Sequence, residues 1–208
     1  MRYFLLSSML AAMVATGCRS VYKGLQTDAA AQPECIRQFA PQFTNTLYSA
    51  QVDVTKHHLS GLVLLKLMPD SAIRLVFANE MGFKFFDFEY DKDGNFTKHF
   101  IIPKMDKKPV VKTLSQDFAL VLLHPDLRKA HVARENGERF VVAPTEKGNN
   151  YYITDSACTE LRRIEKSSRR KPVVRVELRH YQNGIPDSIL IKHLNFKFNI
   201  SLQRVEKK

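Results

Sequence analysis

The chain has 208 residues, which is enough for one domain with a sizeable hydrophobic core. Its formal net charge of +11 would ordinarily point to a nucleic acid, but anionic lipid headgroups or an acidic envelope polymer satisfy the same electrostatics. A basic, solvated surface without a specific partner is the third alternative. Beyond residue 18 no stretch approaches the ~18 uninterrupted apolar residues of a membrane-spanning helix, so nothing there is expected to span a membrane.

Residues 1–17 have the layout of a secretory signal peptide. Arg2 supplies the positive charge, and the apolar run 4–14 is too short for an ordinary membrane span. Small residues, Ala15-Thr16-Gly17, then stand directly before Cys18. This cysteine resembles that of a lipobox, and the resemblance implies cleavage before Cys18 and acylation of its thiol and amino group. An ordinary signal peptide with a chance cysteine is the alternative.

An acylated Cys18 would attach the protein to a membrane, since each buried methylene group is worth roughly 0.8 kcal/mol and several chains hold a protein firmly. No acidic cluster follows Cys18, so by resemblance to known sorting rules we expect a periplasm-facing position on the outer membrane. This location argues against a nucleic-acid partner. We predict a lipidated N-terminus and flexible tether over 18–32, a single domain over 33–208, and a monomer.

Two further cysteines, Cys35 and Cys158, would lie in an oxidising compartment. They could form a disulfide that joins the N-terminal segment to a late strand, or remain two isolated thiols. The sequence leaves both possibilities open.

Short segments with alternating apolar and polar residues follow a short helix predicted over 33–43, and such alternation is typical of half-buried strands. Turn signals separate them, among them 68–71, Asp93-Gly94 and Asn136-Gly137. Strands are predicted over 48–54, 59–68, 73–78, 83–90, 96–102, 130–134, 139–143, 151–154, 158–166, 173–181, 189–193 and 194–203.

Residues 109–123 break the strand pattern. Their apolar residues have helical spacing, and the opposite face, which includes Gln116 and Asp117, is polar. Pro109 suits a first helical turn, and Pro125 lies just beyond the end. The pattern predicts an amphipathic helix packed against a sheet.

The predicted fold class is mainly β (α+β), with about ten or eleven strands in a single, strongly curved antiparallel sheet. The short connections require antiparallel neighbours, and so many strands in one sheet curl into an open half-barrel. The amphipathic helix would plug its concave face. Barrels of this size commonly enclose one apolar ligand.

The lipobox, the curved sheet and the covering helix together resemble the Lol lipoprotein carriers, periplasmic LolA and the outer-membrane receptor LolB. Residues 61–70 are similar to a Gly…Lys-Arg-Pro hairpin of those proteins, and 74–89 resembles LolB-like lipoproteins of the Bacteroidetes group, whose role is largely unassigned. Gly184-Ile185-Pro186 fits the C-terminal half of the family.

One difference from the carriers concerns the residues before Pro69. LolA has an arginine there that helps to latch its lid, whereas this chain has Leu67 and Met68. The resemblance to LolB-like receptors implies that Leu67 and Met68 form a loop that touches the membrane. Alternatively, both residues end a buried strand.

The function implied by the resemblance is binding of acyl chains of lipoproteins or other envelope lipids in an apolar cleft between sheet and helix. The helix 109–123 would shift to admit or release them. The alternative is a structural or interaction lipoprotein with a packed core and no ligand. Alternation, which leaves a flip to the other face of a strand open, predicts that the cleft is lined by Val52, Val63, Leu65, Phe77, Phe86, Phe88, Leu114, Phe118, Phe196 and Phe198.

A basic run could face anionic headgroups, or could be a solvated loop. It consists of Arg162, Arg163, Arg169, Arg170 and Lys171.

Catalysis is not expected. The sequence has neither a Gly-x-Ser-x-Gly elbow nor a His-Glu-x-x-His zinc helix, and its histidines lack metal-ligand spacing. Asp87 and Glu89 share one face of a predicted strand, and they fit the solvent side of an edge strand better than an acid/base pair. We therefore expect no enzyme, no metal and no cofactor.

Overall fold

The computed structural model describes residues 20–168 and 170–205. The predicted signal peptide, Cys18 and Arg169 lie outside the described residues. Two helices occur in the described part, the 3₁₀ helix η2 (Pro33–Phe39) and the α-helix α2 (Lys108–Leu122). The strands are β1 (Gln26–Thr27), β2 (Asn45–Val54), β3 (His57–Leu67), β4 (Ile73–Ala78), β5 (Lys84–Tyr90), β6 (Phe96–Ile101), β7 (His131–Glu135), β8 (Glu138–Thr145), β9 (Gly148–Asp155), β10 (Leu161–Ser167), β11 (Pro172–Gln182), β12 (Ile185–His193) and β13 (Phe198–Arg204).

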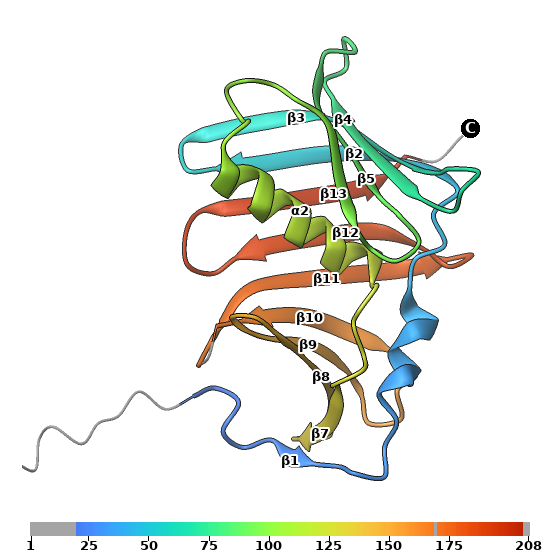
Figure 1. The fold of residues 1–208 in the computed structure, drawn as a ribbon, viewed down its shortest axis with the longest axis vertical. Helices are drawn as coiled ribbons and strands as arrows, with labels where there is room; N and C mark the ends of the chain where they lie inside the picture. The colour runs from blue at the N-terminus through green and yellow to red at the C-terminus, as the bar shows by residue number, and fades with distance from the viewer. Residues whose placement is uncertain (1–19, 169, 206–208) are drawn as a thin grey trace, which may run out of the picture.

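All of these strands form one antiparallel sheet, in the order β1-β7-β8-β9-β10-β11-β12-β13-β2-β3-β4-β5-β6. One meander runs from β2 in the middle to β6 at one edge, and a second runs from β7 near the other edge back to β13. The two meanders join where β13 pairs with β2. Because β6 lies at one edge of the sheet and β7 lies next to the other edge, the helix that connects them crosses the concave face (Figure 1).

The hydrophobic core lies between this concave face and α2. Inward-facing residues of adjacent strands are paired in register, as Val63 is with Phe77 and Phe77 with Phe86. Phe86 in turn contacts Phe118 of the helix, with 6.0 Å between the ring centroids. The alternation that predicted half-buried strands thus places one apolar row of each strand under the helix.

The predicted fold class is confirmed in its main features: the described chain is mainly β, and its single antiparallel sheet is open and carries a helix on the concave face. The sheet has 13 strands rather than about ten or eleven. Each of the twelve ranges predicted as strands overlaps one of β2–β13, so the strand without a predicted range is β1, in the segment that was predicted to be a tether. The last strand begins at Phe198 and not at residue 194, because 194–197 form the turn that precedes it.

Residues 20–31, which we call the N-terminal strap, cover part of the convex face near Tyr22 and Leu25 and then join the edge of the sheet as β1. The ring of Tyr22 stacks on that of Tyr151 with 3.8 Å between centroids. Leu25 packs against the same small cluster of buried residues, and β1 pairs with β7. Although the sequence indicated a flexible tether here, this part of the chain is packed against the sheet.

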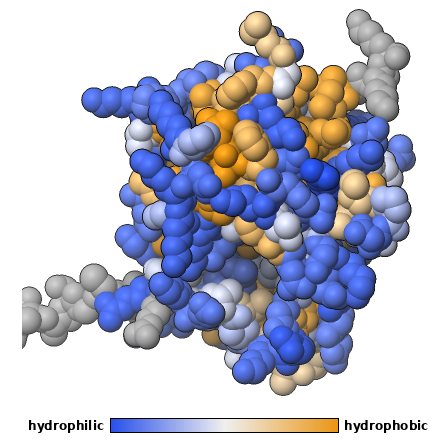
Figure 2. Space-filling model, turned by 45° about the horizontal axis from the view of Figure 1, so that its top comes forward, coloured by the Kyte–Doolittle hydropathy of each residue, from blue (hydrophilic) through white to orange (hydrophobic). Residues whose placement is uncertain are grey.

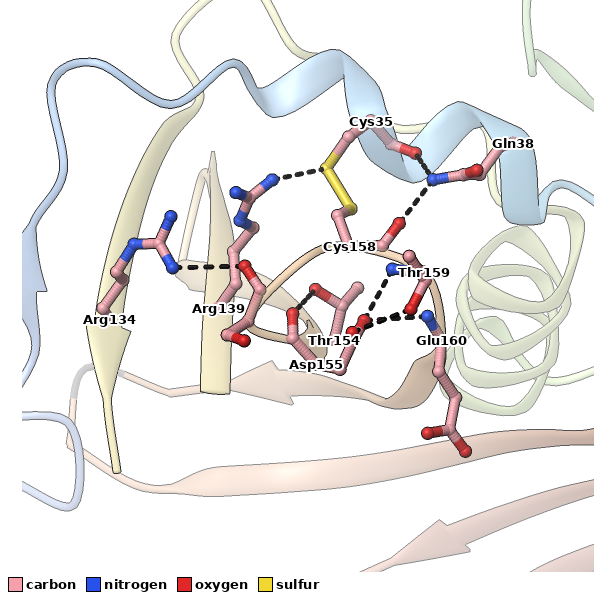
Figure 3. Close-up of a disulfide and its surroundings, with 10 residues drawn as sticks. Cys35, Gln38, Arg134, Arg139, Thr154, Asp155, Cys158, Thr159 and Glu160 are labelled. Atoms are coloured by element: carbon pink, nitrogen blue, oxygen red, sulfur yellow. Dashed lines mark hydrogen bonds between the residues drawn. A yellow bond between two sulfur atoms is a disulfide. The ribbon is translucent and has the colours of Figure 1, made fainter. Parts of the chain in front are cut away.

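A disulfide joins Cys35 of η2 to Cys158 in the turn between β9 and β10 (Figure 3). Of the two alternatives left open by the sequence, the structure shows the pairing. The Gln38 side chain bridges the same two segments, since its Nε2 donates to the carbonyls of Cys35 at 2.9 Å and Cys158 at 2.7 Å. The turn itself is closed by Asp155, whose carboxylate accepts hydrogen bonds from the backbone N–H groups of Thr159 and Glu160.

Asp87 corrects one expectation from the sequence. It is not on the solvent side of an edge strand, because β6 covers the outer side of β5. Its carboxylate is buried and accepts hydrogen bonds from Arg74 at 2.8 and 3.0 Å and from Lys84 at 2.8 Å. Burial alone raises the pKa of Asp87, but these hydrogen bonds bring the pKa below its ordinary value.

No helix in the described part of the chain is both long and apolar enough to cross a bilayer.

Candidate functional site: an apolar cleft under helix α2

A cleft of about 470 Å³ lies between the N-terminal half of α2 and strands β2 to β5 and β13. Ligand pockets commonly measure about 300–1,000 Å³. The cleft opens at one end of the sheet, where His57, Lys104 and Phe196 are exposed. Figure 2 shows hydrophobic residues gathered on this face of the molecule and surrounded by hydrophilic ones.

The lining follows from strand alternation and helical spacing. Val52 of β2 lies beside Ile200 of β13 in register, so both side chains point to the concave face. On α2, Val110, Leu114 and Phe118 are four residues apart and share one face of the helix. Two apolar surfaces therefore face each other, and they meet where Phe118 contacts Phe86.

Most of the residues predicted from the sequence do line the cleft. They are Val52, Val63, Phe77, Phe86, Leu114, Phe118, Phe196 and Phe198. Leu65 and Phe88 do not. Each lies two residues further along its strand than a lining residue, on the same face but deeper in the core. There the Phe88 ring stacks on Phe86 and meets Phe96 edge to face. Alternation predicts on which face of a strand a side chain lies, but it does not predict how far the cleft extends along that strand.

Several lining residues were missed by sequence reasoning. Phe85 and Phe86 are adjacent, yet both border the cleft, because a β-bulge between β4 and β5 disturbs the alternation there. Ile102 and Met105 come from the segment between β6 and α2, and their apolar character directly before the helix was the available signal. The remaining ones are Val54, His57, His58, Leu59, Lys104, Pro109, Val110, Thr113 and Ile200.

The polar lining residues stand at the mouth of the cleft or on the helix above it. They include Lys104 and the two adjacent histidines, and His58 Nδ1 lies 2.9 Å from Asp53 Oδ1. No carboxylate is among the lining residues of the described chain. The cleft therefore has an apolar interior and a basic entrance, which suits a molecule with an apolar chain and an anionic end.

Polar contacts at the middle of α2 attach the helix to the sheet. Asp117 Oδ2 lies 2.7 Å from His193 Nε2 of β12, and both side chains are almost fully buried. The Tyr90 hydroxyl donates to the Ser115 carbonyl at 2.7 Å, and Lys166 Nζ donates to Gln116 Oε1 at 2.5 Å. The sequence pattern placed Asp117 on the polar face of the helix, but the structure shows that its side chain is buried against the sheet.

Leu67 and Met68 lie at the end of the sheet opposite the cleft mouth. Leu67 ends β3 and has a relative exposure of 44%, and Met68 begins the turn to β4. These residues are therefore accessible, but they are remote from the cleft.

The basic run divides into two parts. Arg163 is ion-paired with Glu138 at 2.7 Å and with Glu165 at 3.1 Å, and Arg162 also contacts Glu138, so these two arginines are engaged within the protein. Arg170 and Lys171 are exposed in the turn between β10 and β11.

No group of three or more His, Cys, Asp and Glu side chains that could hold a metal ion occurs in residues 20–168 and 170–205.

Comparison with known proteins yields similarity of fold only. No protein-family model matches the sequence, and no curated protein matches it. Among solved structures, a domain described as an outer membrane lipoprotein-sorting protein domain, from Vibrio parahaemolyticus, is similar at 8% identity and a TM-score of 0.49, over 86% of this chain and 92% of that one. A LolA superfamily protein from Nitrosomonas europaea has 6% identity and a TM-score of 0.48, over 87% and 93%.

A DUF1329 family protein from Desulfovibrio piger is similar at 8% identity and a TM-score of 0.46, over 87% of this chain and 92% of that one. The layout predicted from the sequence, an open antiparallel sheet with a helix across its concave face, is the layout that the described residues form.

Proposed function

We propose that this protein binds acyl chains of lipoproteins or other envelope lipids in the cleft beneath α2, and hands them on without catalysis. The single observation that carries the proposal is the cleft itself, which is large, apolar inside and basic at its mouth. A tightly packed core would have supported the alternative of an interaction protein without a ligand, and a cleft of about 470 Å³ argues against it.

The energetics favour reversible binding. Burial of ten methylene groups contributes about 8 kcal/mol, at ~0.8 kcal/mol each. Association itself costs an estimated ~4–15 kcal/mol. These two magnitudes are similar, so a single acyl chain in this cleft would exchange, which a carrier or a receptor requires.

The proposed location is the periplasmic face of the outer membrane, with an acylated Cys18 as the anchor. Support comes from the signal-like residues 1–17 and from the disulfide between Cys35 and Cys158, because disulfides persist in oxidising compartments such as the periplasm. The protein would act there as a monomer.

The proposal is tested with the chain that begins at residue 18 and carries Cys18→Ser. Native mass spectrometry and lipid extraction measure what copurifies, and a fluorescent fatty acid measures uptake. We expect about one acyl lipid per chain, or saturable uptake at that ratio. A ligand-free protein that also ignores added fatty acid and lipopeptide would contradict the proposal.

Two matched variants locate the binding site. Val52→Trp places a bulky side chain in the cleft, whereas Val76→Trp makes the same change at a half-buried position on the convex face of β4. We expect Val52→Trp to weaken uptake at least tenfold and Val76→Trp to leave it unchanged. Equal effects of the two variants would place the ligand elsewhere.

A further inference from the structure

The N-terminal strap fixes where the chain joins the folded body. The backbone N–H of Val21 and the hydroxyl of Ser20 both donate to the Arg170 carbonyl, at 3.0 and 3.3 Å. The Tyr22 hydroxyl donates to Glu165 at 2.8 Å, and this buried carboxylate is also held by two arginines of the sheet. Ser20 is therefore held beside the turn between β10 and β11.

That turn lies at the same end of the sheet as the mouth of the cleft. In an antiparallel meander every second connection is at the same end. The turns β2–β3, β4–β5, β8–β9, β10–β11 and β12–β13 therefore share one end with the segment 102–107. We call this end the mouth rim, and the opposite end the far rim. In Figure 1 the strap begins on the left, beside the left-hand turns of this end of the sheet.

The two rims differ in charge. Exposed basic residues on the connections of the mouth rim include Lys56, Lys104, Lys147, Arg170, Lys171 and Lys197, against the acidic Glu80, Asp106 and Glu146. Asp106 is paired with Lys98 at 2.7 Å. On the far rim, the β3–β4, β5–β6 and β9–β10 turns carry Asp70, Asp91, Asp93 and Glu160 against Lys92. An anionic surface is thus attracted more strongly to the mouth rim than to these three turns of the far rim.

Large apolar side chains project from the mouth rim as well. Met81 in the β4–β5 turn has a relative exposure of 93%, and Phe83 beside it has 58%. Phe196 in the β12–β13 turn is exposed to 50% and also lines the cleft. Basic residues interspersed with exposed apolar ones fit the boundary between headgroups and acyl chains.

We propose that the mouth rim docks on an anionic lipid bilayer, and that the strap holds the body in this orientation. The proposal rests on the proposed anchor at Cys18. Cys18 stands two positions before Ser20, a span of at most about 7 Å. An anchor there brings the β10–β11 turn to the bilayer surface, and the cleft mouth comes with it. An acyl chain can then pass between cleft and membrane without crossing water.

The orientation is tested on the chain that begins at Cys18, coupled through the Cys18 thiol to a maleimide lipid. The vesicles contain phosphatidylglycerol and phosphatidylcholine. A soluble amine-acylating reagent is added, and mass spectrometry measures the rate at each lysine. We expect Lys56, Lys104 and Lys197 to react at least threefold more slowly than in free protein. Lys66 and Lys92, near the far rim, should react at unchanged rates. Equal rates at both rims, or protection of the far rim alone, would overturn the proposal.

Variants separate the contributions of the rim and of the strap. Met81→Ser with Phe83→Ser should reduce the protection, whereas Leu67→Ser, an exposed leucine at the far rim, should not. Tyr22→Ala removes the stacking on Tyr151 and the hydrogen bond to Glu165, which leaves the strap held mainly by the contacts of Ser20, Val21 and Leu25. A strap detached as far as Gln26 would lengthen the span from Cys18 to about 28 Å. We expect Tyr22→Ala to abolish most of the protection. An unchanged pattern in Tyr22→Ala would show that the strap does not set the orientation.

Uptake of fatty acid is measured on the same protein in solution. Normal uptake without protection of the mouth rim would overturn this inference alone. Protection without uptake would overturn the proposed function and leave the docking surface standing.

Discussion

Asp117 of α2 and His193 of β12 form a buried polar pair, with 2.7 Å between Oδ2 and Nε2, directly behind the cleft. The His193 ring contacts the rings of both Phe196 and Phe198, which line the cleft, with 4.7 and 4.9 Å between centroids. Burial raises the pKa of Asp117, and the hydrogen bond to His193 opposes this. The pair therefore ties the helix to the sheet at the point where the cleft ends.

The first prediction concerns this pair. Asp117→Ala leaves His193 buried without its partner, and we expect a loss of about 3–5 kcal/mol in the free energy of unfolding. Replacement of both residues, Asp117→Leu with His193→Phe, should cost less than the two single changes together. Urea unfolding of the unaltered protein, Asp117→Leu, His193→Phe and the double variant measures the coupling, and purely additive costs would contradict it.

The second prediction concerns the disulfide. Replacement of both Cys35 and Cys158 by serine should lower the stability by roughly 2–4 kcal/mol, because the bond closes a long loop between residues 123 apart. Fatty-acid uptake by the folded variant should persist, since neither cysteine lines the cleft. Treatment of the unaltered protein with a reductant is the control and should reproduce the loss in urea unfolding.

The third prediction concerns Gly61 in β3. A β-carbon at this position would lie 2.2 Å from the Ala78 carbonyl oxygen, so Gly61→Ala must push two neighbouring strands apart. We expect a cost of roughly 1–3 kcal/mol, as for other overpacked sites. The adjacent, exposed Ser60 is the control, and Ser60→Ala should stay within about 0.5 kcal/mol. Urea unfolding measures both variants. Similar unfolding midpoints for Gly61→Ala and Ser60→Ala would contradict the prediction, because the strands would then adapt without cost.

The fourth prediction concerns pH and Asp155. The backbone hydrogen bond from Glu160 is the largest of the effects that lower the pKa of Asp155 to about 2 in the folded state, against 3.8 otherwise. A carboxyl with a lowered pKa stabilises the fold above pH 3.8, and its contribution disappears as the pH falls through about 2. The stability difference between the unaltered protein and Asp155→Ala should therefore shrink from pH 5 to pH 2. A stability difference that stays constant between pH 5 and pH 2 would contradict this prediction.

Local pattern was sufficient for most of the strands and for most of the cleft. Val63, Phe77 and Phe86 were placed correctly because alternation fixes the face on which a strand residue lies. Leu65 and Phe88 were not, because the depth of the cleft depends on where α2 crosses the sheet. That position depends on the whole fold and cannot be predicted from the residue pattern of one strand.

The partners of Asp117 and Tyr22 in distant segments could not be predicted from the sequence pattern. Asp117 has the spacing of a polar helix face, and only the approach of His193, which is 76 residues away, explains its burial. Similarly, the composition of 20–31 indicated a tether, whereas Tyr22 finds its partner Glu165 143 residues later. In both cases a polar group is wholly or partly withdrawn from solvent because a partner on a distant strand satisfies it.

The last strand of the chain, β13, occupies the middle of the sheet, between β12 and β2. Until it is added, the two meanders cannot join, so folding must wait for contacts between the two ends of the sequence and is expected to be slow. Phe198 and Ile200 of this strand also line the cleft. A chain in which β13 has not yet paired with β2 therefore lacks part of the cleft lining. The cleft is completed only when these two segments, far apart in the sequence, have come together.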